Sequence, residues 1–275
     1  MPKNLPEPKP LLERMNSALI QSKEEEDRQF VTALGRGLSL LAAFEHQDQL
    51  SHQQLCQMTA LPKATITRLI YTLTTLGFLR ITAHGQYELG SSAVRLSAAA
   101  WSRHDAVAFA EPLLRQFATQ NEVSVNLATE IEGEMRYLAC CRSPARLSVN
   151  LQVGSAVPVA RTAIGRAFYA ASLPTRQALI RSHLQDSLST IDYSHAQTAL
   201  DQSAEYYQQH GHTLSDGEYS PDILAVAVGV FDVATGLYEY SLNASVPRAN
   251  WDADEYAAKI VPRLQALAER IGRGD

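Results

Sequence analysis

The residues best suited to bind a charged ligand lie in segment 61–79, LPKATITRLIYTLTTLGFL. At about 100° per residue of a helix, its apolar side chains gather on one side. These are Ile66, Leu69, Ile70, Leu73 and Leu76. The opposite side holds Ala64, Thr67, Arg68, Tyr71 and Thr75, and it has one cation and no acid. Because a merely solvated helix usually mixes both signs of charge, this face predicts contact with a polyanion.

The elements before this segment have the signals needed to position it. Apolar residues at helical spacing over 31–44 indicate a first helix. Ser51, followed three residues later by Gln54, has the capping-box pattern, which predicts a second helix from there to about Thr59. Pro62 suits the first turn of a third helix, because its missing N–H would have no partner there.

The elements after the segment complete a recognisable unit. Gly77 predicts the end of the third helix, and strands at 78–81 and 86–89 around Gly85 predict a hairpin. Three helices and a hairpin make a winged helix-turn-helix, here over residues 30–90. In that architecture the reading helix enters the major groove of DNA, and the wing tip lies near the backbone.

Candidate DNA-contacting residues follow from this geometry. They are Lys63, Ala64, Thr65, Thr67, Arg68 and Tyr71 on the third helix, Arg36 on the first helix and His84 in the wing. Units of this kind also serve as protein-interaction modules, so docking of a protein partner is the alternative that the pattern leaves open.

The charge of the whole chain argues against a nucleic-acid binder, but its distribution does not. Net charge is −5, whereas a phosphate-facing protein usually has a basic domain. Residues 31–100 hold five basic and three acidic side chains, and residues 101–275 hold fourteen basic and twenty acidic ones. The acidity therefore belongs to the second half of the chain.

Length and composition set the broad class. A chain of 275 residues suggests two domains at roughly 150 residues each. No apolar run reaches the ~18 residues of a membrane span, and the amino terminus MPKNLPEPKP lacks the apolar core of a secretory signal. We therefore expect the protein to be in the cytoplasm.

The composition of residues 1–29 predicts a flexible tail, with a loosely docked helix as the alternative. Cys56, Cys140 and Cys141 fit no disulfide framework and no CxxC spacing, which predicts reduced thiols.

The second half predicts a separate α+β domain. Residues 91–104 indicate a linker helix, and a domain over 105–275 follows. We expect strands at 123–131, 135–141, 146–153, 223–232 and 237–245, and helices at 162–171, 174–184, 194–209 and 252–271. Strands grouped in this order between helices are typical of an antiparallel sheet.

Signatures of an enzyme are missing from the sequence. It has no GxSxG elbow, P-loop, dinucleotide fingerprint, HExxH or CxxC. The pair His210 and His212 could hold a metal, but no further ligand stands at a familiar spacing, so a loop after a helix is the favoured interpretation. We therefore predict no catalytic residue, no metal and no cofactor.

Three segments together resemble the IclR family of bacterial transcriptional regulators. They are LPKATITRLIYTLTTLGFL, VGSAVPVARTAIGRAF and GHTLSDGEYSPDILAVAVGVFD, in the family's order, within a resemblance that spans residues 31–271. The resemblance implies a winged helix-turn-helix, a linker helix and a GAF-like domain that binds a small molecule. It also implies a homodimer or homotetramer, and one reading helix per chain predicts a palindromic operator on double-stranded DNA.

The same resemblance implies an effector site. Its residues here are Val149, Val157, Ala160, Arg161, Thr162, Ala163 and Ile164, then Ser215, Asp216, Ile223 and Ala225, then Ser241 and Asn243. Three places depart from the family pattern. Ala160 and Arg161 replace a usual histidine and alanine, Ser215 with Asp216 replaces an acidic pair, and Ala225 replaces a frequent cysteine. These changes leave the fold implied but put the identity of the ligand in doubt.

Independent chemistry at one of these segments favours an anion. Thr162 to Ile164 would open a helix whose first N–H groups lack partners and attract negative charge. Arg161 would add a charge-assisted donor for a carboxylate, although a surface salt bridge is the alternative role for that arginine. With an apolar lining from Val149, Val157, Ile164 and Ile223, the effector is expected to be an aromatic or small organic acid, and the regulator to control its catabolism.

Overall fold

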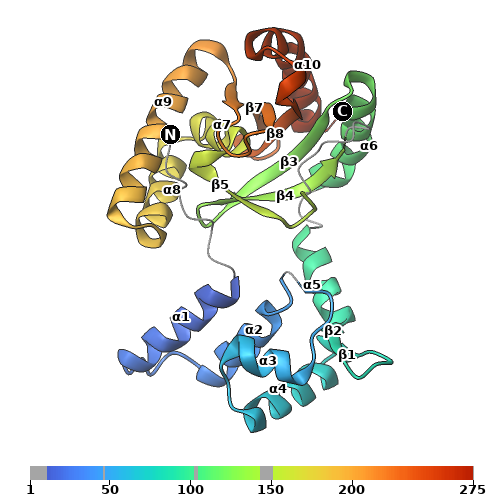
Figure 1. The fold of residues 1–275 in the computed structure, drawn as a ribbon, viewed down its shortest axis with the longest axis vertical. Coiled ribbons are helices and arrows are strands. Elements are labelled where there is room, and N and C mark those ends of the chain that lie inside the picture. Colours follow the sequence, from blue (N-terminus) through green and yellow to red (C-terminus); the bar gives the residue numbers. More distant parts are fainter. Residues whose placement is uncertain (1–10, 46, 102–104, 143–150, 275) are drawn as a thin grey trace. The chain divides into compact units, whose positions relative to one another are not determined.

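The computed structural model describes residues 11–45, 47–101, 105–142 and 151–274. These residues divide into two compact units, one ending at the linker helix and the other beginning at residue 105 (Figure 1). Among the described residues, no helix has the length and apolar character to cross a membrane.

The first unit is a winged helix-turn-helix preceded by one helix. Its elements are α1 (Leu11–Glu24), α2 (Thr32–Ala42), α3 (His52–Thr59), α4 (Lys63–Thr75), β1 (Leu79–Ile81), β2 (Tyr87–Leu89) and α5 (Ser91–Trp101). Ile66, Ile70 and Leu73 of α4 are buried in its core, as the helical spacing predicts. Leu76 was expected in the same stripe but is 58% exposed, because the helix ends at Thr75 and the chain turns away there.

The ends of α3 and α4 are set by local signals. The Ser51–Gln54 capping box is present, with the Ser51 N–H donating to Gln54 Oε1 at 2.8 Å. Pro62 is the N-cap of α4 and not part of its first turn, a small correction to the predicted start. Gly77 adopts φ +74°, and the following Phe78 N–H donates to the Leu73 carbonyl at 2.8 Å, which closes the carboxyl end of the helix.

Residues 11–24 form a helix where a tail was expected. The N–H of Leu11 donates to Glu45 Oε2 at 2.6 Å, and the Ser39 hydroxyl donates to Asn16 Oδ1 at 2.5 Å. Leu12 packs against the core of the unit. The apolar residues of this short amphipathic piece thus find a surface on α2, and the docked-helix alternative describes these residues better than a flexible tail.

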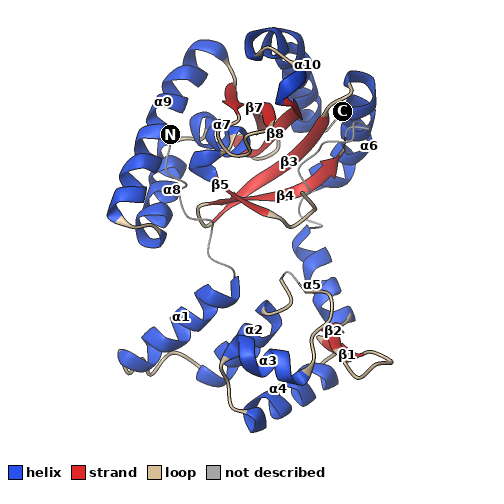
Figure 2. Ribbon diagram, viewed as in Figure 1, coloured by secondary structure: helices blue, strands red, loops and turns tan. Residues whose placement is uncertain are grey.

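The second unit is built on one antiparallel sheet. Its elements are α6 (Asp105–Asn121), β3 (Ser124–Ile131), β4 (Glu134–Cys141), β5 (Ala156–Pro158), the 3₁₀ turn η1 (Val159–Arg161), α7 (Ala163–Ala171), α8 (Pro174–Ser187), α9 (Thr190–His210), β6 (Thr213–Asp216), β7 (Ile223–Asp232), β8 (Leu237–Pro247), the 3₁₀ turn η2 (Arg248–Asn250) and α10 (Ala253–Arg273). The strand order is β5-β4-β3-β8-β7-β6, with every pairing antiparallel. Figure 2 shows the strands of this sheet in red, with helices packed around them. The predicted α+β class with an antiparallel sheet is confirmed.

Two strand predictions need correction. Of the strand expected at 146–153, residues 146–150 lie outside the described residues, and 151–153 are loop; the nearby strand is β5, three residues later. The short edge strands β5 and β6 were not predicted at all. Each has only three or four residues, too few for a period to show.

Alternation along the strands separates the two faces of this sheet. On β8, Leu242, Ala244 and Val246 alternate with Ser241, Asn243 and Ser245. The Ser241 hydroxyl donates to the Ile164 carbonyl at 2.8 Å, so the polar set faces α7. The apolar set faces the opposite way, toward the side covered by α6 and α10. The polar face of the sheet under α7 therefore offers hydrogen-bonding groups to a ligand.

Candidate ligand pocket and nucleic-acid interface

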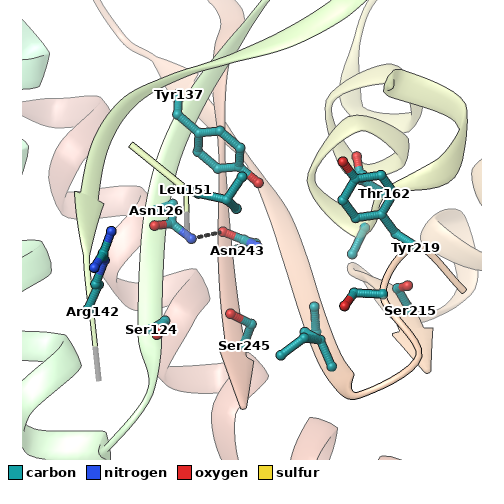
Figure 3. Close-up of a pocket in the computed structure, with 14 residues that line it drawn as sticks. Ser124, Asn126, Tyr137, Arg142, Leu151, Thr162, Ser215, Tyr219, Asn243 and Ser245 are labelled. Atoms are coloured by element: carbon teal, nitrogen blue, oxygen red, sulfur yellow. Dashed lines mark hydrogen bonds between the residues drawn. The ribbon is translucent and has the colours of Figure 1, made fainter. Parts of the chain in front are cut away.

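A pocket lies between the polar face of the sheet and the start of α7 (Figure 3). It is lined by Ser124, Asn126, Tyr137, Arg142, Leu151, Thr162, Ala163, Ser215, Tyr219, Ser220, Ile223, Ala225, Asn243 and Ser245. Its cavity has a volume of about 50 Å³, which is room for a small group of water molecules. Most of the lining is uncharged, and hydroxyl and amide groups outnumber aliphatic side chains.

The floor of the pocket is a pair of buried amides. Asn126 on β3 and Asn243 on β8 are direct partners across the two strands, and Asn126 Nδ2 donates to Asn243 Oδ1 at 2.9 Å. Each has a second polar group, an amide oxygen on Asn126 and an N–H on Asn243. Two residues further along the same strands, and so on the same face of the sheet, Ser124 pairs with Ser245. The floor can therefore both donate and accept hydrogen bonds.

The wall opposite Arg142 is the amino terminus of α7. Thr162 caps the helix, its Oγ1 accepting from the Gly165 N–H at 3.2 Å while donating to the Pro158 carbonyl at 2.9 Å. Ala163 begins the helix and lines the pocket. The first N–H groups of a helix have no carbonyl one turn earlier, and the helix dipole adds positive potential there. This end of the pocket suits an anion.

Tyr137 contributes a neutral phenol to the lining. Burial raises the pKa of Tyr137 well above its ordinary value of 10.0, with smaller contributions from Cys140 and Tyr219. Burial likewise raises the pKa of the neighbouring Cys140 to about 11. Both groups thus stay protonated near neutral pH, so the pocket has no negative charge from this side. All three cysteines are free thiols, as predicted.

A loop after β6 brings Tyr219 and Ser220 to the pocket, and ion pairs hold it on both sides. The Glu218 carboxylate pairs with Arg166 of α7, and Asp216 pairs with Arg248 at 2.5 Å. Gly217, with φ +76°, makes the turn between the two acids. The loop is therefore fastened to α7, whose first turn lines the same side of the pocket (Figure 3).

Six of the predicted effector residues line this pocket. They are Thr162, Ala163, Ser215, Ile223, Ala225 and Asn243. Val157, Ala160 and Ile164 are instead buried in the core around the start of α7. Ser241 is fully buried and occupied with the Ile164 carbonyl, and Asp216 is occupied with Arg248. Val149 lies outside the described residues.

Arg161 lies beside the pocket, next to a lining residue. Arg161 does not line the pocket, and its guanidinium lies over the ring of Tyr219, 5.5 Å from the ring centroid. As the last residue of η1 it precedes the cap of α7, and this turn directs its side chain to Tyr219 and not into the cavity. Among the described residues, the arginine that lines the cavity is Arg142, just beyond β4.

Eight lining residues were missed from the sequence. They are Ser124, Asn126, Tyr137, Arg142, Leu151, Tyr219, Ser220 and Ser245. A signal was present for three of them, because serine and asparagine alternate with valine, leucine and alanine in SVNL of β3 and in SLNAS of β8. Arg142, Leu151, Tyr219 and Ser220 lie outside the strands, where alternation gives no guide. Tyr137 lies within β4, in the run MRYLACC, whose mostly apolar residues do not alternate with polar ones.

The exposed face of α4 has the composition that its sequence predicts. Lys63, Ala64, Thr67, Arg68 and Tyr71 are exposed, and Tyr71 is 73% exposed. Thr65 is half-buried, while Arg36 on α2 and His84 at the tip of the hairpin are exposed. Within the described part of the chain, no acid forms an ion pair with Lys63 or Arg68. Their charges therefore remain available to a polyanion.

The two histidines of the HGH sequence take part in an aromatic cluster. The ring of Tyr206 stacks on His210 at 4.0 Å between centroids and meets His212 edge to face at 5.5 Å. Burial lowers the pKa of His212. Across the described residues, no group of three histidine, cysteine or acidic side chains is placed to hold a metal ion.

In comparisons with known proteins, both units match domains of one family. Residues 33–81 match the description "IclR helix-turn-helix domain", and residues 98–273 match "Bacterial transcriptional regulator IclR C-terminal". A curated relative, "HTH-type transcriptional regulator TsaQ1/TsaQ2" of Comamonas testosteroni, is 26% identical over 260 residues, which is 90% of each protein.

Solved structures agree in fold. An IclR family transcriptional regulator from Brucella abortus is 32% identical, with a TM-score of 0.68 over 90% of this chain and 94% of that one. An IclR homologue from Microbacterium hydrocarbonoxydans, complexed with 4-hydroxybenzoate, is 18% identical, with a TM-score of 0.70 over 88% of this chain and 100% of that one. Both family domains are matched in the order expected of a DNA-binding unit followed by an effector-binding unit. The chain belongs to the IclR family of bacterial transcriptional regulators.

Proposed function

We propose that this regulator binds a palindromic operator on double-stranded DNA as a homodimer or homotetramer and releases or tightens its hold when an organic acid enters the second unit. The observation that supports DNA as the partner is the acid-free face of α4, where Lys63 and Arg68 are exposed and form no ion pair with any acid among the described residues. The named relatives are regulators of transcription, which disfavours the alternative of a protein-docking module. Because its proposed partner is chromosomal DNA, we expect the protein to act in the cytoplasm.

Symmetry of the operator is the first prediction. A single small module buries only about 600–1,000 Å² on DNA, so two reading helices are expected to bind two inverted half-sites. DNase footprinting on the region upstream of the gene should therefore show two protected half-sites related by a two-fold axis. Affinity should fall steeply with salt, because each Lys or Arg on a phosphate releases counterions. A single unpaired half-site, or retention that ignores salt, would contradict this assembly.

The pocket of the second unit supports an acidic effector. Arg142 and the start of α7 supply positive potential at opposite edges, and the buried Asn126–Asn243 pair supplies neutral donors and acceptors between them. Leu151 and Ile223 add apolar surface. A cavity of about 50 Å³ is smaller than the usual ligand pocket, so the side chains of the loop at Tyr219 move outward to admit a ring or short aliphatic chain.

Calorimetry on the whole protein tests the charge of this effector. The panel contains small aromatic and aliphatic carboxylic acids and their amides, and 4-hydroxybenzoate is a suitable first member because the Microbacterium homologue is complexed with it. An acid should bind at least about tenfold more tightly than its amide, since a hydrogen bond to a charged group contributes about 1.5–3 kcal/mol. Arg142→Ala should remove most of that preference.

Arg161→Ala is the comparison variant, because Arg161 is a nearby cation that is not in the lining, although it lies over the lining residue Tyr219. It should leave the acid-to-amide ratio unchanged. Amides that bind as well as acids, or equal losses in the two variants, would remove the case for a carboxylate. A true effector must also change operator affinity by the same factor by which the operator changes effector affinity, because linkage is reciprocal.

A further inference from the structure

The hydroxyl of Thr67 on α4 is already used inside the protein. Thr67 Oγ1 donates to the Lys63 carbonyl at 3.0 Å and lies 3.0 Å from Nε2 of His52, the first residue of α3. A hydroxyl has one hydrogen, and that of Thr67 is donated to the Lys63 carbonyl. The hydroxyl oxygen must therefore accept a hydrogen bond from the His52 ring. The polar end of Thr67 therefore points toward the protein, although the residue is exposed.

His52 fixes this arrangement through its second nitrogen. Nδ1 of His52 lies 3.5 Å from the sulfur of Cys56, one turn along α3. With the proton on Nε2, Nδ1 accepts from the thiol, and every donor in the series finds an acceptor. The series runs from Cys56 to His52, across to Thr67 and back to Lys63. It joins α3 to α4 and holds the threonine side chain in one rotamer.

An exposed threonine held in this way presents its methyl group. The side chain of Thr67 has only two heavy atoms beyond Cβ, and Oγ1 is held against His52 and Lys63. Ala64, three residues earlier and also exposed, lies beside it on the helix surface and adds a second methyl. Two methyl groups thus form a small apolar patch between the cationic side chains of Lys63 and Arg68.

We propose that Thr67, positioned by His52, reads the C5-methyl group of a thymine in each operator half-site. The inference rests on the proposed DNA-reading role of α4. Among the four bases only thymine has a methyl group in the major groove, and apolar contacts from alanine or threonine methyls distinguish it. Thr67 is then a specificity-determining residue that works through its apolar atom, and His52 is its positioning residue.

The test uses a duplex that the wild-type protein selects from a random pool. Each thymine of the selected half-site is replaced by deoxyuridine, which pairs identically but lacks the methyl group. At one position the replacement should weaken wild-type binding about fourfold per half-site, the effect of losing one buried methyl. Thr67→Val keeps the methyl group, replaces the hydroxyl with a second methyl, and should keep this thymine preference. Thr67→Ser keeps the hydroxyl and should lose the preference.

Variants of His52 separate positioning from general stability. His52→Ala frees the hydroxyl to turn outward and should bring the thymine-to-deoxyuridine ratio close to that of Thr67→Ser. His52→Gln retains an N–H donor and should restore the wild-type ratio. The inference is overturned if deoxyuridine has no effect at any position, if Thr67→Ser keeps the preference, or if Thr67→Val abolishes binding. Failure to enrich any sequence would instead refute the DNA-reading role itself.

Discussion

Gly165→Ala is expected to lower the free energy of unfolding of the second unit by about 3 kcal/mol or more, at the upper end of the cost of overpacking. A Cβ at Gly165 would lie 2.3 Å from the Val159 carbonyl oxygen and 2.5 Å from the Val159 Cα. Both neighbours are backbone atoms, which cannot turn aside as a flexible side chain can. The requirement for glycine here comes from close approach of η1 to α7.

Neither partner in that contact has room to shift. Thr213 donates to the Ala163 carbonyl at 2.7 Å, and Ser241 donates to the Ile164 carbonyl at 2.8 Å, so α7 is fastened to strands on both sides of its first turn. Val159 is fully buried beneath it. Because the first turn of α7 is also a wall of the pocket, effector binding should be lost together with stability.

Denaturant unfolding followed by circular dichroism measures the effect, since the two units can unfold in separate transitions. Gly37→Ala on α2 is the matched control, because its Cβ would meet only Leu69 Cδ2 at an ordinary 3.9 Å. That substitution should be neutral or should stabilise the first unit by up to about 1 kcal/mol. A Gly165→Ala protein within about 1 kcal/mol of wild type would show that η1 yields more easily than its packing indicates.

The first unit could be predicted almost element by element because its signals are local. The capping box at Ser51 and the left-handed Gly77 are set by residues within one turn of each helix end. The core stripe of α4 spans several turns at the helical period. Its prediction was wrong only at Leu76, which lies beyond the end of the helix. The docking of α1 was left undecided because it depends on a surface of α2 that the sequence of α1 does not contain.

The pocket was harder to predict because its residues are brought together by strand pairing over long separations. Asn126 and Asn243 are 117 residues apart, and only the register of β3 with β8 makes them partners. Arg161 was chosen because it precedes a predicted helix start, which is a local argument. The side chain direction in η1, which no sequence pattern sets, placed it against Tyr219, while the distant Arg142 reached the cavity.

Removal of Arg68 should have the largest effect on DNA binding. Arg68 is exposed one turn into α4, beside the methyl patch of Ala64 and Thr67, and has no ion-pair partner among the described residues. Arginine binds guanine O6 and N7 with two hydrogen bonds, or a phosphate with its charge. Arg68→Ala should therefore cost about 1–3 kcal/mol per half-site, and about twice that for a dimer on both half-sites.

Two further measurements decide what Arg68 contacts. Arg68→Lys keeps the charge but loses the planar pair of donors, so at a guanine it should recover little affinity and at a phosphate most of it. Binding to operators with a changed base at each position should show relaxed preference at one position if Arg68 reads a base. If Arg68 contacts the DNA phosphate backbone instead, the loss of affinity should be uniform across sequences. The salt dependence of binding should then become shallower by about one counterion per half-site. Unchanged affinity of Arg68→Ala on the selected operator would remove Arg68 from the interface, and the acid-free face of α4 would then need another explanation.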